Sequence, residues 1–186
     1  GRQPDHLRVL PGLSVTVAET VEEAQARFDE LQDLIHPDHG LAFLSRRIGH
    51  DLTGMDPDIP MPDLPAVDDV GTRSGQMLEL AKRENWTLRQ LYQHFAAARG
   101  HMLLIGTPSM VADTMQEWFE NGACDVFNII PSVFPDEFES FVDLVVPELQ
   151  RRGLYRTAYE GNTLRDRLSL PEPMSRYDAA SASAAE

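Results

Sequence analysis

Two polar residues that could take part in binding or catalysis lie beside apolar runs of this sequence. Asn128 is the polar member of the run CDVFNIIP, so its amide must find a hydrogen-bond partner. That partner is either neighbouring backbone or a bound molecule. His101, in RGHM, precedes a second segment of this kind, and its imidazole can form a hydrogen bond to a ligand. A purely structural histidine is the alternative, and the residues alone leave both roles open.

The other candidate groups point to simpler roles. His36 and His39, in HPDH, have a spacing that suggests metal ligands, but Pro37 breaks the helix that would align them. No further ligand follows nearby, so we expect no metal site. Cys124 is the single cysteine, which excludes an internal disulfide, and its apolar surroundings predict a buried, unreactive thiol. Nucleophile-elbow, P-loop and dinucleotide motifs are absent from the sequence.

Arginines offer a second kind of candidate. Arg46, Arg47 and Arg99 could meet an anionic substrate, although solvated or salt-bridged roles are favoured for all three. The chain as a whole is acidic, with 16 basic and 30 acidic residues and a net charge of −14. That charge argues against non-specific binding to nucleic acid or to an anionic membrane. The sequence has neither a membrane-length apolar run nor the apolar core of a signal peptide, so we expect a cytoplasmic protein.

The amino-terminal part predicts a strand followed by a helix. Apolar and polar residues alternate through Leu13, Val15 and Val17, which favours a strand over residues 7–17. Thr20 and Glu23 form a capping-box pattern at the start of an amphipathic helix that Pro37 ends.

A loop-rich insertion is expected next. Residues 37–70 have room for a short helix near 40–48, and four prolines then favour an extended path over the surface. Two helices follow, over about 74–84 and from Thr87, where Gln90 completes another capping box, to Gly100. Long insertions are often lids or binding loops, and a passive surface loop is the equally weighted alternative.

The stretch from His101 to Ser132 predicts a second strand–helix–strand unit. An apolar run over 102–105, interpreted as strand or loop, leads to a helix capped by Thr107, with Trp118 and Phe119 on its buried stripe. A buried parallel strand is expected over CDVFNIIP.

The last predicted helix follows that strand. We expect Asp136 and Glu139 to cap its amino terminus, and Pro147 to kink or restart it. Strands separated by helices favour parallel βα units. Two such strands cannot bury both faces of a sheet, so the chain must oligomerise or form part of a larger barrel or open sheet. It also begins with Gly1 rather than methionine, which leads us to expect a piece of a longer protein.

Three segments carry a resemblance to a known family. ETVEEAQARFDELQDLIHPDHG, RGHMLLIGTPSMVAD and PELQRRGLYRTAYEGNTLRDRL resemble the C-terminal part of the nitrilotriacetate monooxygenase component A group. This group lies within the bacterial-luciferase-like flavin monooxygenases, and the resemblance extends from about Gly1 to Leu170. GTPSMVAD alone would indicate only the wider superfamily, whereas the last segment is specific to the group.

The resemblance implies an α/β fold, the C-terminal part of a (β/α)8 TIM barrel over residues 1–170. Leu7–Val17 would be the seventh strand and Val126–Ile130 the eighth, with a helical and loop insertion over about 37–100 between them. Residues 171–186 would form a disordered tail. The first six strands, with the serine- and glycine-rich turn that holds the flavin phosphate in this family, are not in the sequence. Whether this chain alone is an enzyme therefore stays open.

The activity that the resemblance implies is oxygenation of a small organic substrate with O2. Reduced FMN from a separate flavin reductase would be the cofactor, and the substrate would be of the aminopolycarboxylate or sulfur-compound type. Asn128 and His101 would bind the cofactor, and the segment after the eighth strand, Ile130, Pro131 and Ser132, would line the substrate side. We expect a homo-oligomer. The alternative is a non-catalytic fragment that needs a partner or self-association to complete the barrel; a deazaflavin-dependent oxidoreductase fits the last segment less well.

Overall fold

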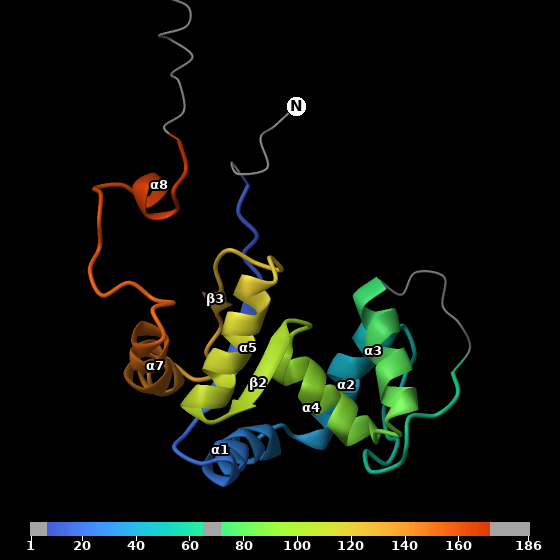
Figure 1. The fold of residues 1–186 in the computed structure, drawn as a ribbon. Helices are drawn as coiled ribbons and strands as arrows, with labels where there is room; N and C mark the ends of the chain where they lie inside the picture. The colour runs from blue at the N-terminus through green and yellow to red at the C-terminus, as the bar shows by residue number, and fades with distance from the viewer. Residues whose placement is uncertain (1–6, 65–71, 172–186) are drawn as a thin grey trace, which may run out of the picture.

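A parallel three-stranded sheet forms the centre of one half of the molecule (Figure 1). The structure is a computed structural model that describes residues 7–64 and 72–171. Its strands are β1 (Gly12–Val17), β2 (Met102–Gly106) and β3 (Asn128–Ile129), in the order β2-β1-β3. β1 is therefore hydrogen-bonded along both edges, to segments that lie far away in the sequence.

The run over 102–105 that the sequence left as strand or loop is a strand. Leu13 pairs with Met102 and Val17 with Gly106, so β2 follows β1 over five residues. The expected neighbours β1 and β3 are also paired, at Gly12–Asn128 and Leu13–Ile129. β3 is shorter than the strand that the apolar run predicts. The sheet thus has one strand more than expected, and β2 occupies the edge of β1 opposite β3.

One face of the sheet packs on helices. Leu13, Val15 and Val17 of β1 are buried in a cluster with α5 (Pro108–Glu120) and the helix that follows β3. Val111 and Ala112 supply the fully buried part of α5. The predicted stripe on α5 is partly wrong, because the Phe119 side chain is 52% exposed. Trp118 is half-buried and packs against Phe127, with ring centroids 6.4 Å apart.

The helix after β3 is interrupted as Pro147 predicts. It consists of α6 (Asp136–Ser140), a π-helical turn (Phe141–Val145) and α7 (Val146–Arg151). The Val146 N–H donates to Phe141 O, five residues back, so the helix widens just before the proline, which has no N–H to donate. The predicted cap at Asp136 and Glu139 is wrong. Pro135 is the N-cap of α6, and no side chain caps that end.

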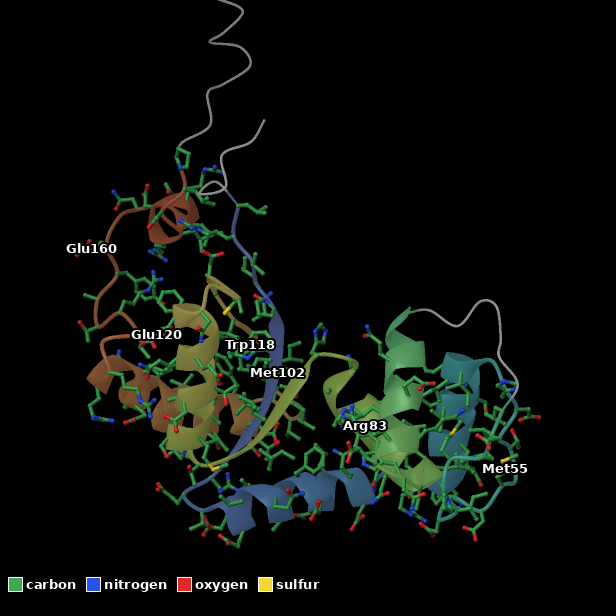
Figure 2. All side chains as sticks on the ribbon, turned by 45° about the vertical axis from the view of Figure 1, so that its right-hand side comes forward. Met55, Arg83, Met102, Trp118, Glu120 and Glu160 are labelled. Carbon is green, nitrogen blue, oxygen red and sulfur yellow. The ribbon has the colours of Figure 1, made fainter. Side chains whose placement is uncertain are left out.

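Three helices form the other half around a core of their own. They are α2 (Pro37–Ile48), α3 (Thr72–Arg83) and α4 (Leu88–Ala98). Their shared core contains Leu41, Leu44, Ile48, Leu52, Ala81, Leu88, Leu91, Tyr92 and Phe95. Figure 2 shows Met55 and Arg83 in this half and Met102 and Trp118 in the half built on the sheet. The three helices predicted between residues 37 and 100 are all present, and the first of them begins at Pro37 rather than near residue 40.

Proline and threonine set the helix boundaries. Pro37 follows the end of α1 (Val21–Asp33) and is the first residue of α2, where a missing N–H costs little. Thr87 and Gln90 form the predicted capping box. At α1 only half of the predicted box is present, since Thr20 accepts from the Glu23 N–H.

The ends of the described chain lie together. Arg8 donates to Asp125 Oδ1 at 3.1 Å and to the backbone oxygen of Leu168, just after α8 (Leu164–Arg167). Figure 1 shows α8 beside the segment that leads into β1. The tail predicted over 171–186 lies outside the described residues, apart from Pro171. Within residues 7–64 and 72–171, none of the helices has the length and apolar character needed to cross a bilayer.

Candidate functional site

The face of the sheet opposite α5 and α7 carries small and polar residues. Side chains alternate along a strand, so Gly12, Ser14 and Thr16 face away from the cluster that holds Leu13 and Val15. These three residues define the small-residue face. Ser14 and Thr16 are 1% and 2% exposed, so their hydroxyls need partners inside the protein. Ser14 Oγ donates to Ala97 O of α4 at 3.4 Å.

Two of the predicted site residues converge on Gly12. A Cβ atom built on Gly12 would lie 2.6 Å from His101 Nδ1 and 2.7 Å from Ile130 Cδ1. A side chain at position 12 would therefore displace the imidazole, the Ile130 side chain or the strand. His101 reaches this point from the start of β2, and Ile130 from the end of β3. Glycine is what lets the two groups approach β1 from opposite neighbours.

His101 lies at the amino-terminal end of β2 rather than at the carboxyl end expected for a residue facing a barrel mouth. It precedes Met102, the first residue of that strand. Its side chain is exposed, so the imidazole is accessible to a ligand. A ligand bound at this end of β2 would contact the imidazole beside Gly12.

Asn128 lies beside the same glycine. It pairs with Gly12 in the sheet register, is exposed, and its Nδ2 donates to Leu10 O at 3.4 Å. The sequence left two partners open for this amide, neighbouring backbone or a bound molecule, and the structure shows a bond to backbone. The carboxamide oxygen has no hydrogen bond among those described, so it is available to a donor on a ligand.

Ser132 is held by a residue that sequence reasoning did not identify. The Ser132 N–H donates to Glu137 Oε2 at 2.9 Å, and Thr16 Oγ1 donates to Glu137 Oε1 at 3.1 Å. One carboxylate thus links β1 to the segment after β3. A threonine at an inward position of a buried strand was the available signal, because its hydroxyl requires a partner. Pro131 lies between Ile130 and Ser132 and is half-buried.

His36, the N-cap of α2, and His39 lie at the start of that helix. The rings of His36 and His39 lie edge to face, 5.9 Å between centroids, and His36 Nδ1 accepts from the Asp38 N–H as the N-cap. In the described parts of the chain no three His, Cys, Asp or Glu side chains come together as metal ligands.

The remaining candidates have structural surroundings. The Arg47 guanidinium lies 5.2 Å from the Phe43 ring centroid. Arg99 is the left-handed C-cap of α4, where its N–H donates to Phe95 O. Cys124 is 4% exposed, and burial, with the nearby Asp125 charge, raises the pKa of its thiol. The predicted unreactive cysteine agrees with this environment.

The proline-containing segment of the insertion is fixed to α4. Asp58 accepts two hydrogen bonds from Arg89, at 2.6 and 3.1 Å, and Arg89 also donates to the hydroxyl of buried Tyr92. The hydrogen bond from Arg89 lowers the pKa of Asp58, and burial raises the pKa of Tyr92. Backbone bonds from Leu88 N to Ile59 O and from Arg89 N to Pro57 O continue the attachment.

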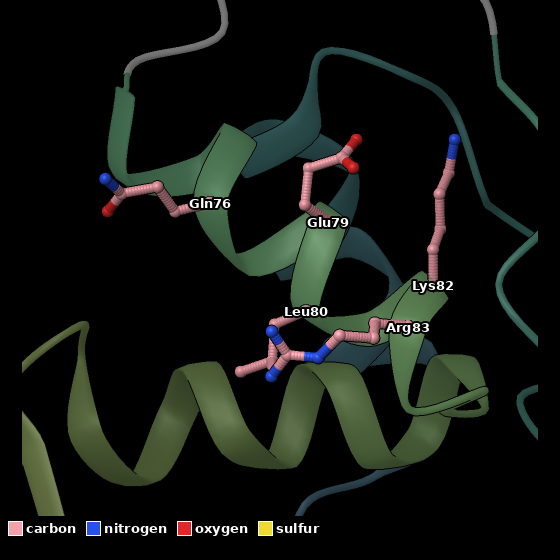
Figure 3. Close-up of a pocket in the computed structure, with 5 residues that line it drawn as sticks. All are labelled: Gln76, Glu79, Leu80, Lys82 and Arg83. Carbon is pink, nitrogen blue, oxygen red and sulfur yellow. The ribbon is translucent and has the colours of Figure 1, made fainter.

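Two surface hollows lie away from Gly12. One, on α3, is lined by Gln76, Glu79, Leu80, Lys82 and Arg83 (Figure 3). The other lies past the carboxyl ends of β1 and β2, where parallel sheets commonly hold ligands, and its lining includes Glu19, Thr107 and Ser109. Hydrogen bonds from Arg151 and Arg152 lower the pKa of Glu148 in its wall to about 2. The carboxylate is thus already paired with cations.

Relatives cover nearly the whole chain. It is 46% identical over 180 residues to N-acetyl-S-(2-succino)cysteine monooxygenase of Bacillus subtilis, covering 95% of this chain and 41% of that protein. It is 47% identical over 175 residues to nitrilotriacetate monooxygenase component A of Aminobacter aminovorans, covering 93% and 39%. The chain therefore spans well under half the length of these relatives. A search with family models gives no match.

Solved structures agree with the sequence matches. EDTA monooxygenase from Chelativorans sp. BNC1 superposes with a TM-score of 0.62 at 32% identity, over 91% of this chain and 40% of that one. A riboflavin lyase structure with modified FMN and riboflavin has a TM-score of 0.65 at 28% identity, over 95% and 38%.

Proposed function

We propose, from the confirmed resemblance of this chain to the nitrilotriacetate monooxygenase group, that it forms the C-terminal segment of a two-component flavin monooxygenase. The observation that carries this proposal is the 47% identity to component A, which extends over 93% of the chain. An identity of this size over one continuous segment is support for a shared fold and a shared role of that segment. The activity, the substrate and the partners belong to the larger enzyme.

The same proposal gives the sheet its place in a (β/α)8 barrel. β1 and β3 would be the seventh and eighth strands, since they are parallel and adjacent, and residues 37–100 would be the insertion between them. β2 would be an additional strand, supplied by the end of the insertion. The small-residue face would then look into the barrel, because the opposite face packs on α5 and α7 as an outer helix layer does.

Residues around Gly12 fit one side of a flavin. Exposed His101 and Asn128 offer polar groups that can form hydrogen bonds, and Ile130 offers an apolar contact. All three lie beside Gly12, which has no side chain. Reduced flavin, when bound, supplies the chemistry that activates O2. His101 and Asn128 would orient it, and Ile130, Pro131 and Ser132 would line the substrate side. The phosphate would be held by the part of the enzyme outside this sequence.

The reaction we propose uses FMN reduced by a separate flavin reductase, with an aminopolycarboxylate or a sulfur compound as substrate. The helical block would act as a cover that excludes water from the flavin. Its separate core and the Asp58–Arg89 attachment support a rigid unit rather than a loose loop. A cytoplasmic location and a homo-oligomeric state stay parts of this proposal.

Flavin binding and reductase-coupled turnover test the proposal. The chain is mixed with FMN, a flavin reductase and NADH, and bound flavin is followed by absorbance while peroxide and oxygenated product are measured. The proposal predicts bound flavin, and more peroxide or product than the reductase gives alone once the rest of the enzyme is supplied. If no flavin binds at millimolar FMN, the monooxygenase proposal is wrong and the non-catalytic alternative is favoured.

That alternative is a non-catalytic segment that needs a partner or self-association to complete the barrel. A specific feature favours it: Phe134, Phe138 and Val142 are exposed at four-residue spacing in the chain that follows β3, an edge strand of the sheet. The Phe134 and Phe138 rings stack 5.7 Å apart. Sedimentation and binding of a hydrophobic dye test this function. A compact monomer that binds no dye would argue against it.

A further inference from the structure

We propose that Glu137 is the positioning residue that holds the Ile130–Ser132 segment on β1. Its effect on flavin or substrate binding rests on the proposed function, whereas its effect on the segment does not. Glu137 is half-buried on α6 and does not itself reach Gly12, where His101 and Ile130 meet. It acts through the segment that carries the proposed substrate-side residues.

The sheet alone cannot hold this segment. Within the described residues, the last backbone bond between β1 and the chain after β3 runs from Ile130 N–H to Leu13 O at 2.8 Å. Beyond it, β1 continues to Val17 without β3 beside it. The next attachment to β1 is the Glu137 carboxylate, which accepts from Thr16 Oγ1 and from the Ser132 N–H. The Glu137 side chain thus takes the place of the next backbone hydrogen bond between β1 and the chain after β3.

The chemistry of these three groups makes the link strong and directional. A carboxylate has two oxygens and accepts hydrogen bonds more strongly than a neutral group. Thr16 is 2% exposed in the central strand, so water cannot replace the carboxylate as the hydrogen-bond partner of its hydroxyl. A glutamine at 137 can keep both bonds, because its oxygen accepts from the Ser132 amide and its NH2 group donates to the Thr16 hydroxyl. An alanine keeps neither.

A simpler role for Glu137 is to accept locally from Ser132, five residues back, without linking it to β1. The two roles differ at Thr16, which bonds a different oxygen of the carboxylate from the one that Ser132 bonds. If the carboxylate is a link, Thr16→Val frees one end of it, and the Ser132 amide opens more often. If the contact is only local, Thr16→Val leaves that amide unchanged.

Hydrogen exchange at the Ser132 amide in the whole chain, read by NMR, is the measurement. The variants are Glu137→Ala, Glu137→Gln and Thr16→Val. The controls are Thr16→Ser, which keeps the hydroxyl, and Glu139→Ala on the exposed side of the same helix. Thermal unfolding is followed for each variant. If Glu137→Ala fails to fold, the comparison of Thr16→Val with Thr16→Ser still distinguishes the two roles, since Thr16→Val preserves side-chain volume and removes only the hydroxyl.

The link predicts about tenfold faster exchange at Ser132 in Glu137→Ala, a clear increase in Thr16→Val, and near-native exchange in the other three. Unchanged exchange in Thr16→Val would overturn it. Titration with FMN supplies the functional readout: Glu137→Ala should weaken FMN binding while Glu139→Ala does not. If the unmodified chain binds no FMN, the proposed function fails, and amide exchange at Ser132 still shows whether Glu137 links that segment to β1.

Discussion

The imidazole of His101 lies directly against the α-carbon of Gly12, so closely that no side chain fits between them. We expect Gly12→Ala to lower the free energy of unfolding by about 1–3 kcal/mol, as overpacking does in other proteins. It should also shift the NMR signals of the His101 ring and the Ile130 methyl groups, because the new Cβ would lie under 3 Å from both side chains.

Gly75→Ala on α3 is the matched control for this substitution. A Cβ there meets nothing within 4 Å, and glycine in a helix costs about 0.5–1 kcal/mol relative to alanine. Gly75→Ala should therefore be neutral or stabilising in urea unfolding. Equal stability of Gly12→Ala and the unmodified chain would mean that His101 does not lie over Gly12.

The attachment of the insertion to α4 depends on a two-pronged ion pair. Arg89→Lys keeps the charge but removes the planar guanidinium that reaches both oxygens of Asp58. We expect faster proteolytic cleavage within residues 53–61 with little change in the global unfolding midpoint, because the pair is largely exposed. Lys82→Arg, at the exposed Asp63 contact, is the control, and it should leave the cleavage rate unchanged.

The pKa of His94 gives a pH dependence with a definite sign. Burial lowers it from 6.5, and the ring packs on Trp86 with centroids 4.8 Å apart. The unfolded chain therefore takes up the proton more readily than the folded chain. The stability due to neutral His94 is fully present above pH 6.5 and is lost as the pH falls through the lower, folded pKa.

Substituting this histidine tests that sign. His94→Leu should flatten the dependence of unfolding free energy on pH below 6.5, and His39→Leu, at an exposed position, serves as the control. Urea unfolding measured from pH 7 to pH 5 gives the slope. A His94→Leu chain that loses stability on acidification as steeply as the His39→Leu chain would contradict the assignment.

Cys124 should report unfolding. Its buried thiol has a raised pKa, so a thiol-specific reagent at neutral pH should label it slowly in the native chain and quickly in denaturant. The labelling rate should rise with urea in parallel with the unfolding transition. Rapid labelling of the native chain would show that the thiol is accessible.

Local sequence patterns predicted the elements of the fold well, whereas long-range pairing limited the rest. The capping box at Thr87 acts over a few residues, and the helix start that it predicts agrees with the structure. Pro37 was predicted to end the first helix, but α1 ends at Asp33 and Pro37 begins α2. The strand over 102–106 depends on pairing with β1, about ninety residues away in the sequence, which no local pattern contains. Phe119 followed the helical period, but the sequence does not say how wide the buried stripe of α5 is.

The candidate site shows the same division. His101, Asn128 and Ile130 could be selected from their types and positions, and the structure brings them together at Gly12. Glu137 could not be selected, because its importance lies in a bond to Thr16, 121 residues away. Asp136 and Glu139, which looked like caps from spacing alone, have no such bond at the start of α6.

The central claim is that this chain can serve as the C-terminal segment of a flavin monooxygenase. A chimera tests it most directly: the matching segment of nitrilotriacetate monooxygenase component A is replaced by this chain, and FMN binding is titrated. We predict a folded chimera that binds FMN within about tenfold of the parent, a difference of about 1.4 kcal/mol in binding free energy. A chimera that does not fold, or that folds and binds no FMN while the parent does, would contradict the account.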